Sequence, residues 1–156
     1  GGTLAGAGVL GGTALGHPAA DLPAGAAAAD IVANIPLNDH GNRSILIMPN
    51  QVEIVDAGFS VEIPDGWEMQ IRGRSGFATK GLQVTNSPGT IDSDYTGRIK
   101  VILNNTSKNI ITLNHGDRIA QILIKPVWKI NWITTDNIEK ITDRSDKGFG
   151  STGIGE

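Results

Sequence analysis

The 156-residue sequence carries 16 acidic and 13 basic side chains, which gives a net charge of −3 with neutral histidines. A chain of this length suits one domain with its own core, and its acidic balance lacks the basic excess of a general nucleic-acid binder. The absence of cysteine excludes disulfides and thiol chemistry. No apolar run approaches the ~20 residues that a membrane helix needs. The composition therefore favours a cytoplasmic enzyme or binding domain without nucleic-acid or membrane partners.

The first 16 residues differ in composition from the rest of the chain. They are nearly all Gly, Ala, Leu and Thr and carry no charge. So much glycine disfavours a stable helix or strand interior. We predict an N-terminal arm over residues 1–16, either flexible or reaching a neighbouring subunit, and the sequence leaves both alternatives open.

From residue 28 onward, short apolar runs rich in Ile and Val alternate with turn residues such as Pro49-Asn50 and Pro88-Gly89. These residue types suit a pleated sheet, and many short strands at such spacing predict an all-β sandwich or barrel. A turn or two of helix is expected only at residues 76–81. The expected strands span residues 30–35, 44–48, 51–55, 58–63, 67–72, 82–85, 99–104, 110–113, 118–126 and 128–133.

A basic, glycine-rich turn follows the expected strand at residues 67–72. It reads Arg72-Gly-Arg-Ser-Gly76, with Lys80 close behind. Backbone N–H groups and guanidinium groups both suit phosphate oxygens, although turns of this composition are also common without a ligand. Because the whole chain is acidic, a phosphate site on it must be local or assisted by a metal ion.

Two carboxylates stand close together in the turn-rich segment at residues 86–97. Asp92 and Asp94 follow Ile91, and in an extended chain they share a face, whereas a tight hairpin would separate them. A carboxylate fixed at a hairpin can orient a water molecule and accept its proton. The alternative is a surface turn in which aspartate and glycine have only their usual turn role.

Polar side chains also interrupt the apolar strand expected at residues 118–126. Arg118 and Gln121 stand among Ile, Leu and Ala. A buried guanidinium or amide must find hydrogen-bond partners. The two residues are therefore either internal ties or ligand contacts, and both alternatives stay open.

The segment at residues 143–153 places glycines on both sides of Phe149, followed by Ser151 and Thr152. One alternative is a disordered terminus. The other is a lid whose ring stacks on a base while hydroxyl and backbone N–H groups hold phosphates.

Five segments in this order resemble the five motifs of the trimeric dUTPase family. They span residues 25–33, 73–76, 89–97, 116–122 and 144–153. Each motif is short, but their conjunction in order is specific. The chain differs from the family pattern at Ala28 and Ala29, where glycine and tyrosine are usual, and at Ser145 and Lys147, where glycines are common.

The resemblance implies an all-β, jelly-roll-like distorted β-barrel over residues 17–143, with a flexible C-terminal lid over residues 144–156. It also implies a homotrimer whose active sites are shared between subunits. The implied activity is Mg²⁺-dependent hydrolysis of dUTP to dUMP and pyrophosphate. That activity limits uracil in DNA and supplies dUMP for dTMP synthesis.

The resemblance further implies roles for individual residues. Asp92 activates the water that attacks the α-phosphate, and Tyr95 packs against the deoxyribose and excludes a 2′-hydroxyl. Asn86 reads the uracil edge with backbone groups of its hairpin, and Asp30 helps to hold hydrated magnesium. The remaining residues expected to bind substrate are Arg74, Ser75, Gly76, Gly89, Ile91, Gln121, Arg144, Phe149, Gly150, Ser151 and Thr152.

Two other functions are compatible with such a fold. A dCTP deaminase of this fold uses a glutamate on the strand that follows the third motif, and residues 99–104 contain none. A jelly-roll binding protein without catalysis would need neither Asp92 nor Tyr95. The sequence therefore favours the hydrolase over both alternatives.

Overall fold

The computed structural model describes residues 26–139 of the chain. The predicted arm at residues 1–16, the lid at residues 144–156 and the site residues Arg144, Phe149, Gly150, Ser151 and Thr152 lie outside this part. The elements are β1 (Ala29–Val32), β2 (Ser44–Ile47), β3 (Val52–Ser60), β4 (Trp67–Arg72), α1 (Ser75–Ala78), β5 (Leu82–Val84), β6 (Gly89–Ile91), β7 (Arg98–Asn105), β8 (Ile111–Asn114) and β9 (Arg118–Pro126).

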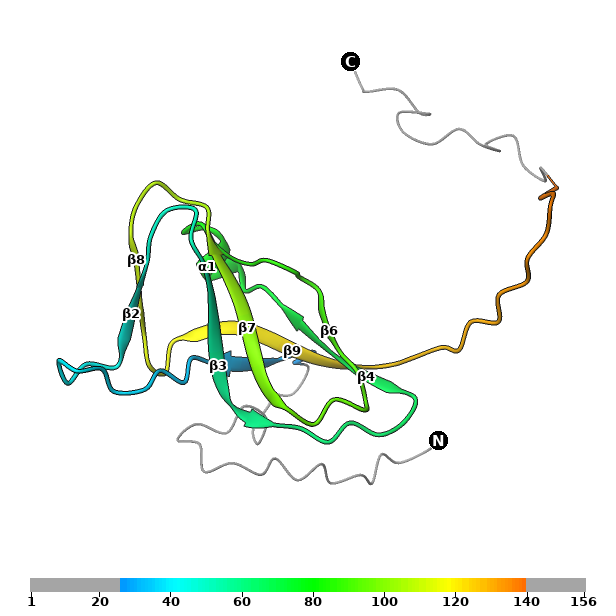
Figure 1. Cartoon of the computed structure of the whole chain (residues 1–156), viewed down its shortest axis with the longest axis horizontal. Helices are drawn as coiled ribbons and strands as arrows, with labels where there is room; N and C mark the ends of the chain where they lie inside the picture. The colour runs from blue at the N-terminus through cyan, green and yellow to red at the C-terminus, as the bar shows by residue number, and fades with distance from the viewer. Residues whose placement is uncertain (1–25, 140–156) are drawn as a thin grey trace, which may run out of the picture.

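The strands form three antiparallel sheets (Figure 1). The largest has the strand order β1-β9-β4-β6, the second pairs β2 with β8, and the third has the order β3-β7-β5. The expectation of an all-β chain is confirmed. Within the described residues no helix is long and apolar enough to cross a membrane.

The core lies between the sheets and follows from the alternation of side chains along the strands. In β7 every second residue points inward, and Ile99, Val101 and Leu103 are all buried. Ile31 of β1, Leu113 of β8 and Ile119 of β9 meet the same core and are fully enclosed. Because the strand period of two residues places apolar side chains on one face, the opposite face stays free for polar residues.

Strand β3 is longer than expected and contains a bulge. We predicted separate strands at residues 51–55 and 58–63, but one strand runs through the gap. Its register against β7 shifts from Asp56↔Lys100 to Ser60↔Arg98, so three residues of β3 oppose one residue of β7. Gly58 sits in this bulge with a φ of +86°, a backbone conformation that glycine adopts without steric cost.

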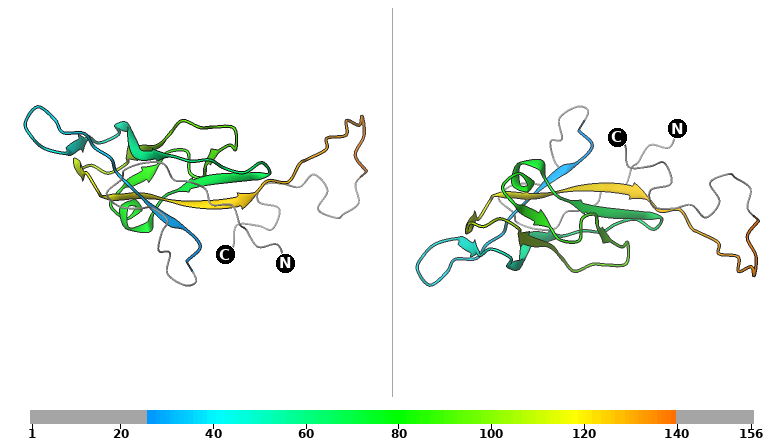
Figure 2. Two further views of the ribbon diagram at one scale, coloured as in Figure 1. Left: turned by 90° about the horizontal axis from the view of Figure 1, so that it is seen from below. Right: turned by 90° about the horizontal axis from the view of Figure 1, so that it is seen from above.

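Three further predictions differ from the structure. Strand β6, at Gly89–Ile91, was not expected, because three residues after a proline carry no strand pattern. Conversely, residues 128–133 were expected to form a strand, and they are extended but have no strand partner within residues 26–139. Figure 2 shows this segment leaving the barrel as a continuation of β9. The helix expected at residues 76–81 is the shorter α1 at Ser75–Ala78.

Candidate active site

Three polar residues lie in one row across the four-stranded sheet. Asp30 of β1 pairs with Gln121 of β9, and Gln121 pairs with Arg72 of β4. Directly paired residues project from the same face of a sheet. The side chains of all three residues are half-buried, whereas their neighbours Ile31, Ile71 and Ile122 point into the core. The row therefore lies on the outer face of this sheet.

Arginines converge on the carboxylate of this row. The Arg74 Nε lies 2.7 Å from Asp30 Oδ1, and Arg118 Nη1 lies 3.6 Å from Oδ2 of the same residue. Arg74 also donates a hydrogen bond from Nη1 to the Arg118 carbonyl at 3.1 Å. Two guanidinium groups against one carboxylate leave a local positive charge, which suits a phosphate group on an otherwise acidic chain.

The structure corrects the expected environment of Arg118 and resolves that of Gln121. Arg118 was expected to lie buried inside a strand, but its side chain is 65% exposed, because the residue lies at the register shift between β1 and β9. Gln121 donates from Nε2 to the Gly73 carbonyl at 2.9 Å. This hydrogen bond ties the glycine-rich turn to β9, and Ser75 and Gly76 follow that turn in exposed positions at the start of α1.

The hairpin after β5 stands beside this turn. The Gly73 N–H donates to Ser87 Oγ at 3.3 Å, so the glycine-rich turn and the hairpin are in contact. Asn86 packs over Gly89, where an added Cβ would lie 2.9 Å from the asparagine Nδ2. Glycine at this position therefore allows the amide to lie against the hairpin backbone.

Beyond β6 the chain turns sharply at the two predicted carboxylates. The Tyr95 N–H donates to the Asp92 carbonyl at 3.1 Å, and both Asp92 and Asp94 are exposed. The extended geometry that would place the two carboxylates on one face is therefore absent. The Tyr95 hydroxyl donates to the Arg98 carbonyl at 2.9 Å, which holds the ring against the returning chain.

The turn with Asp92 lies well away from the arginine cluster in the same chain. The row with Gln121 crosses β4 at Arg72, whereas Ile91 pairs with Met69, three residues further along. Three strand residues span about 10 Å, and Asp92 lies beyond Ile91 in the same direction. One chain thus brings Asp30, Arg74 and Gln121 together but not Asp92 with them.

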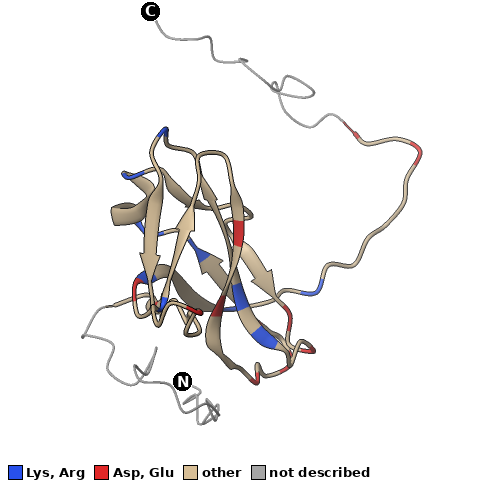
Figure 3. Ribbon diagram, turned by 60° about the vertical axis from the view of Figure 1, so that its left-hand side comes forward, with Lys and Arg blue, Asp and Glu red and all other residues tan. Residues whose placement is uncertain are grey.

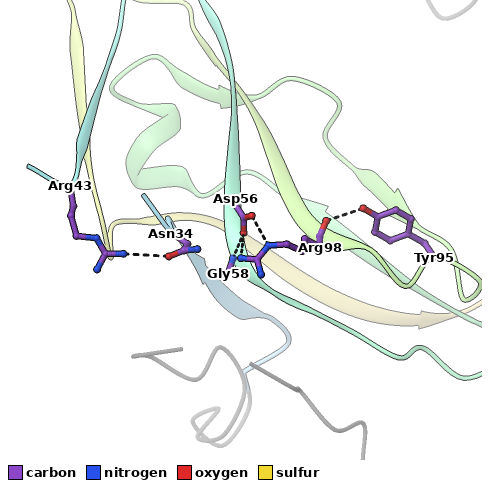
Figure 4. Close-up of polar contacts among 6 residues, drawn as sticks. All are labelled: Asn34, Arg43, Asp56, Gly58, Tyr95 and Arg98. Atoms are coloured by element: carbon purple, nitrogen blue, oxygen red, sulfur yellow. Dashed lines mark hydrogen bonds and ion pairs between the residues drawn. The ribbon is translucent and has the colours of Figure 1, made fainter. Parts of the chain in front are cut away.

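An ion pair next to Tyr95 was not predicted from the sequence. Arg98 donates two hydrogen bonds to Asp56, from Nε at 2.7 Å and from Nη2 at 2.9 Å (Figure 4). The hydrogen bonds from Arg98 lower the pKa of Asp56, against the opposing effect of partial burial. The pairing depends on the β3–β7 register at the bulge, and no local motif signals it.

The described residues supply few metal ligands. Within residues 26–139 no group of three His, Cys, Asp or Glu side chains lies together. The Asp30 carboxylate is partly exposed on the sheet face, and Mg²⁺ typically binds one or two carboxylates together with water and substrate phosphates. Asp30 therefore fits a contact with a hydrated ion that arrives with a triphosphate, and it does not fit a complete protein-only metal site.

Comparison with known proteins identifies the relatives of this chain. A family model described as dUTPase matches residues 40–153. The deoxyuridine 5′-triphosphate nucleotidohydrolase of Dinoroseobacter shibae is 49% identical over 134 residues, which cover 84% of each protein.

Solved structures show the same fold. A mutant dUTPase of Staphylococcus bacteriophage 80alpha with dUpNHpp has a TM-score of 0.71 at 22% identity, covering 86% of this chain and 90% of that one. A mutant dUTPase of phage phi11 of S. aureus, which coordinates a structural Mg(II) ion, has a TM-score of 0.61 at 21% identity, covering 74% and 86%.

Fold and sequence thus define the class of this protein, an all-β chain with the jelly-roll-like fold of nucleotide hydrolases. The chain belongs to the dUTPase family. The resemblance drawn from the five motifs and the expected fold class are confirmed, and so is the expectation of an enzyme of this family.

Proposed function

We propose that this chain hydrolyses dUTP to dUMP and pyrophosphate. The observation that carries the proposal is the convergence of Arg74 and Gln121 with Asp30 on one sheet face, where the arginines leave a local positive charge for phosphates. The hairpin that begins at Asn86 offers polar groups to a base, and a second copy of the chain would supply it to this site. Family membership supports the same substrate, because relatives carry the name of this activity.

Recognition of the nucleoside belongs to the hairpin. The Asn86 amide and the backbone N–H and C=O groups near Gly89 and Ile91 offer both donors and acceptors to a uracil edge. The Tyr95 ring, held by its hydrogen bond to Arg98, forms a flat surface for the deoxyribose. A 2′-hydroxyl would meet this ring, which disfavours ribonucleotides.

In this proposal the phosphates are bound by the arginine cluster and the glycine-rich turn on the four-stranded sheet. Arg74 presents a guanidinium fork that matches phosphate oxygens, and Ser75 and Gly76 add a hydroxyl and a backbone N–H group. Gln121 holds the turn through Gly73. A bound Mg²⁺ would neutralise triphosphate charge, with Asp30 as its contact through water.

Asp92 is the proposed general base. Its carboxylate lies on an exposed turn, where it can accept a proton from a water molecule aligned with the α-phosphate. Attack in line with the leaving pyrophosphate depends on positioning and charge stabilisation more than on covalent catalysis. The Asp92 carboxylate would position the water, and Arg74 and the metal ion would stabilise the charge.

The separation between Asp92 and Arg74 supports a site shared between copies of the chain. About 10 Å of sheet divides the two within one chain, and in the proposed site a second copy of the chain brings its Asp92 to the arginine cluster. We propose a homotrimer in which the C-terminal tail of a further copy acts as a lid. In this lid Arg144 binds phosphate, and the residues that close over the nucleotide are Phe149, Gly150, Ser151 and Thr152.

The proposed activity has a cellular consequence. Hydrolysis of dUTP limits the incorporation of uracil into DNA and supplies dUMP for dTMP synthesis. The cytoplasm is the proposed location. The deaminase alternative gains no support from the structure, because β7, at Arg98–Asn105, carries no glutamate.

Pyrophosphate release from dUTP in the presence of Mg²⁺ tests the proposal directly. Asp92→Asn should keep the fold and nucleotide binding while lowering kcat by about 10²- to 10⁴-fold, because an amide cannot accept the proton. Asp94→Asn, two residues further in the same exposed turn, is the matched control and should retain turnover. Ammonia release from dCTP, or equal turnover by both variants, would contradict the proposed mechanism.

A further inference from the structure

The ring of Tyr95 is held by the chain that follows it. Its hydroxyl donates to the carbonyl of Arg98 at 2.9 Å. Of the two residues between them, Gly97 has no side chain, and a Cβ there would lie 2.6 Å from the tyrosine hydroxyl oxygen. The position of the Tyr95 ring therefore depends on the position of Arg98, the first residue of β7.

The hydrogen bonds between β3 and β7 restrain the backbone of Arg98 only weakly. The regular pairing of β7 with β3 ends at Asp56↔Lys100, and after the bulge the next pair is Ser60↔Arg98. A bulge interrupts the ladder of hydrogen bonds and leaves residues unpaired. Arg98 therefore begins its strand beyond the interruption, where the backbone alone restrains it weakly.

The side chain of Arg98 crosses the bulge instead. Both nitrogens that bind Asp56 belong to one planar guanidinium, at 2.7 Å and 2.9 Å from the two carboxylate oxygens. Such bidentate pairs fix orientation as well as distance. Figure 4 shows Tyr95 and Asp56 on opposite sides of Arg98, one at its carbonyl and the other at its side chain.

Asp56 is itself fixed by its own surroundings. Its carboxylate accepts a hydrogen bond from the Gly58 N–H, and its carbonyl accepts one from the Asn34 N–H at 2.8 Å. Gly58 lies so close to Asn34 that an added Cβ would meet that side chain at 3.2 Å. Asp56 therefore provides a rigid anchor for Arg98.

We propose that the Asp56–Arg98 pair is a positioning element for substrate selection, which holds Tyr95 where it discriminates deoxyribose from ribose. The proposal rests on the proposed function, since it assumes that Tyr95 faces the sugar. Neither Asp56 nor Arg98 touches the reacting groups. Loss of the pair should allow the ring to move and should admit a 2′-hydroxyl, with a smaller effect on the chemical step.

The chain offers a direct readout, because Tyr95 is its sole tyrosine. Ring-labelled tyrosine therefore gives NMR signals from this one residue. We would compare Asp56→Asn, Arg98→Gln, the double variant and the conservative Arg98→Lys. Gly97→Ala supplies the signals expected of a displaced ring. Lys108→Gln, which removes an exposed positive charge in the turn after β7, is the matched control.

The expected result is a shift of the Tyr95 signals toward those of Gly97→Ala in both single variants. The ratio of kcat/KM for dUTP over UTP should fall by about three- to fivefold, which is the range that a partly exposed ion pair can supply. The double variant should match the single ones, because both remove the same interaction. Arg98→Lys should restore part of the ratio, and Lys108→Gln should match the wild type.

Unchanged Tyr95 signals in Asp56→Asn and Arg98→Gln would overturn the positioning role. Shifted signals with an unchanged dUTP-to-UTP ratio would overturn the role in selection. A wild-type chain that hydrolyses neither nucleotide would instead overturn the proposed function and, with it, the role of the pair in substrate selection. The NMR comparison would still decide whether the Asp56–Arg98 pair positions the Tyr95 ring.

Discussion

Asn105, at the end of β7, is a polar residue with none of its surface exposed. Its Nδ2 donates to the carbonyls of Ile47 and Asn109, both at 2.8 Å. Its Oδ1 accepts hydrogen bonds from the Ser107 N–H and hydroxyl. One amide thus ties the backbone of β2 to that of the turn between β7 and β8.

Replacing this amide should destabilise the fold. Asn105→Ala would leave buried carbonyl and N–H groups without partners, at about 1–3 kcal/mol for each such group, and we expect a loss of about 2–4 kcal/mol in the free energy of unfolding. Asn104→Ala is the matched control, because the Oδ1 of Asn104 has no hydrogen-bond partner. Urea unfolding at one fixed chain concentration compares the two variants, and equal losses would refute the argument.

The Asp56–Arg98 pair should make stability depend on pH. The pKa of Asp56 is lowered in the folded chain, mainly by its hydrogen bonds with Arg98. A lowered pKa means that the contribution is fully present above the unfolded value of about 3.9 and is lost as pH falls through the folded value. The wild type should therefore exceed Asp56→Asn in stability at pH 7, and the difference should shrink below about pH 4.

Chemical unfolding of both chains from pH 7 to pH 3 checks this prediction. Arg98→Gln should show the same loss of pH dependence, because it removes the other partner. A stability difference that stays constant across this range would mean that the pair does not stabilise the fold.

At the scale of elements, the sequence predicted the strands that carry their own alternation. Residues 67–72 and 118–126 match β4 and β9 to the residue. Strand β6 was missed because only its pairing with β4 makes it a strand. The segment at residues 128–133 was wrongly predicted, since apolar residues suited to a sheet form a strand only where a partner strand is present.

The candidate site was predictable to the extent that its residues lie in local motifs. The turn with Arg74 and the hairpin with Asp92 were found from their residue types. The contact between Arg74 and Asp30 was not, because it depends on the register between β1 and β9. Likewise, the exposure of Arg118 follows from a register shift beside it that pattern alone does not reveal.

The bulge of β3 gives a test at this scale. Gly58→Ala places a Cβ on a residue with a φ of +86° and only 3.2 Å from Asn34. The backbone conformation alone costs a non-glycine residue roughly 1–2 kcal/mol, and the contact with Asn34 should add to it. Gly66→Ala is the matched control, since its φ is +83° with no atom within 4 Å. Urea unfolding should show the larger loss for Gly58→Ala, and the reverse order would contradict this account of the bulge.

At the scale of the whole molecule, apolar surface stays exposed on the described part of the chain. Val52 and Ile54 point outward from β3. The segment after β9 extends from the barrel with Trp128 and Trp132 exposed by 85% and 83%. Figure 3 shows that this segment has charged residues near its start and its far end but none between them. Exposed apolar surface of this kind is typical of a protein interface.

The proposed trimer accounts for this surface, because a neighbouring copy can cover it. We therefore expect light scattering to give three times the mass of one chain. The emission of the tryptophans should lie at shorter wavelengths in this species than in a diluted, dissociated one, since two of the three tryptophans of the sequence lie on the extended segment. Activity should fall together with the trimer on dilution, because the proposed site takes Asp92 and Arg74 from different copies. A fully active monomer would refute the shared site.

Charge placed on the extended segment tests whether that segment makes the contact. Ile130→Asp with Ile133→Asp adds two charges at exposed apolar positions and leaves both tryptophans as reporters. Burying unpaired carboxylates at an interface is unfavourable, so dissociation should begin at a chain concentration at least about tenfold higher. Because the dissociation constant of a trimer scales with the square of the chain concentration, this shift is a change of roughly 2.8 kcal/mol in the free energy of assembly. Asn131→Asp with Thr134→Asp adds the same charge at exposed polar positions of this segment and should change assembly less. If both double variants assemble like the wild type, the segment does not dock on a neighbour.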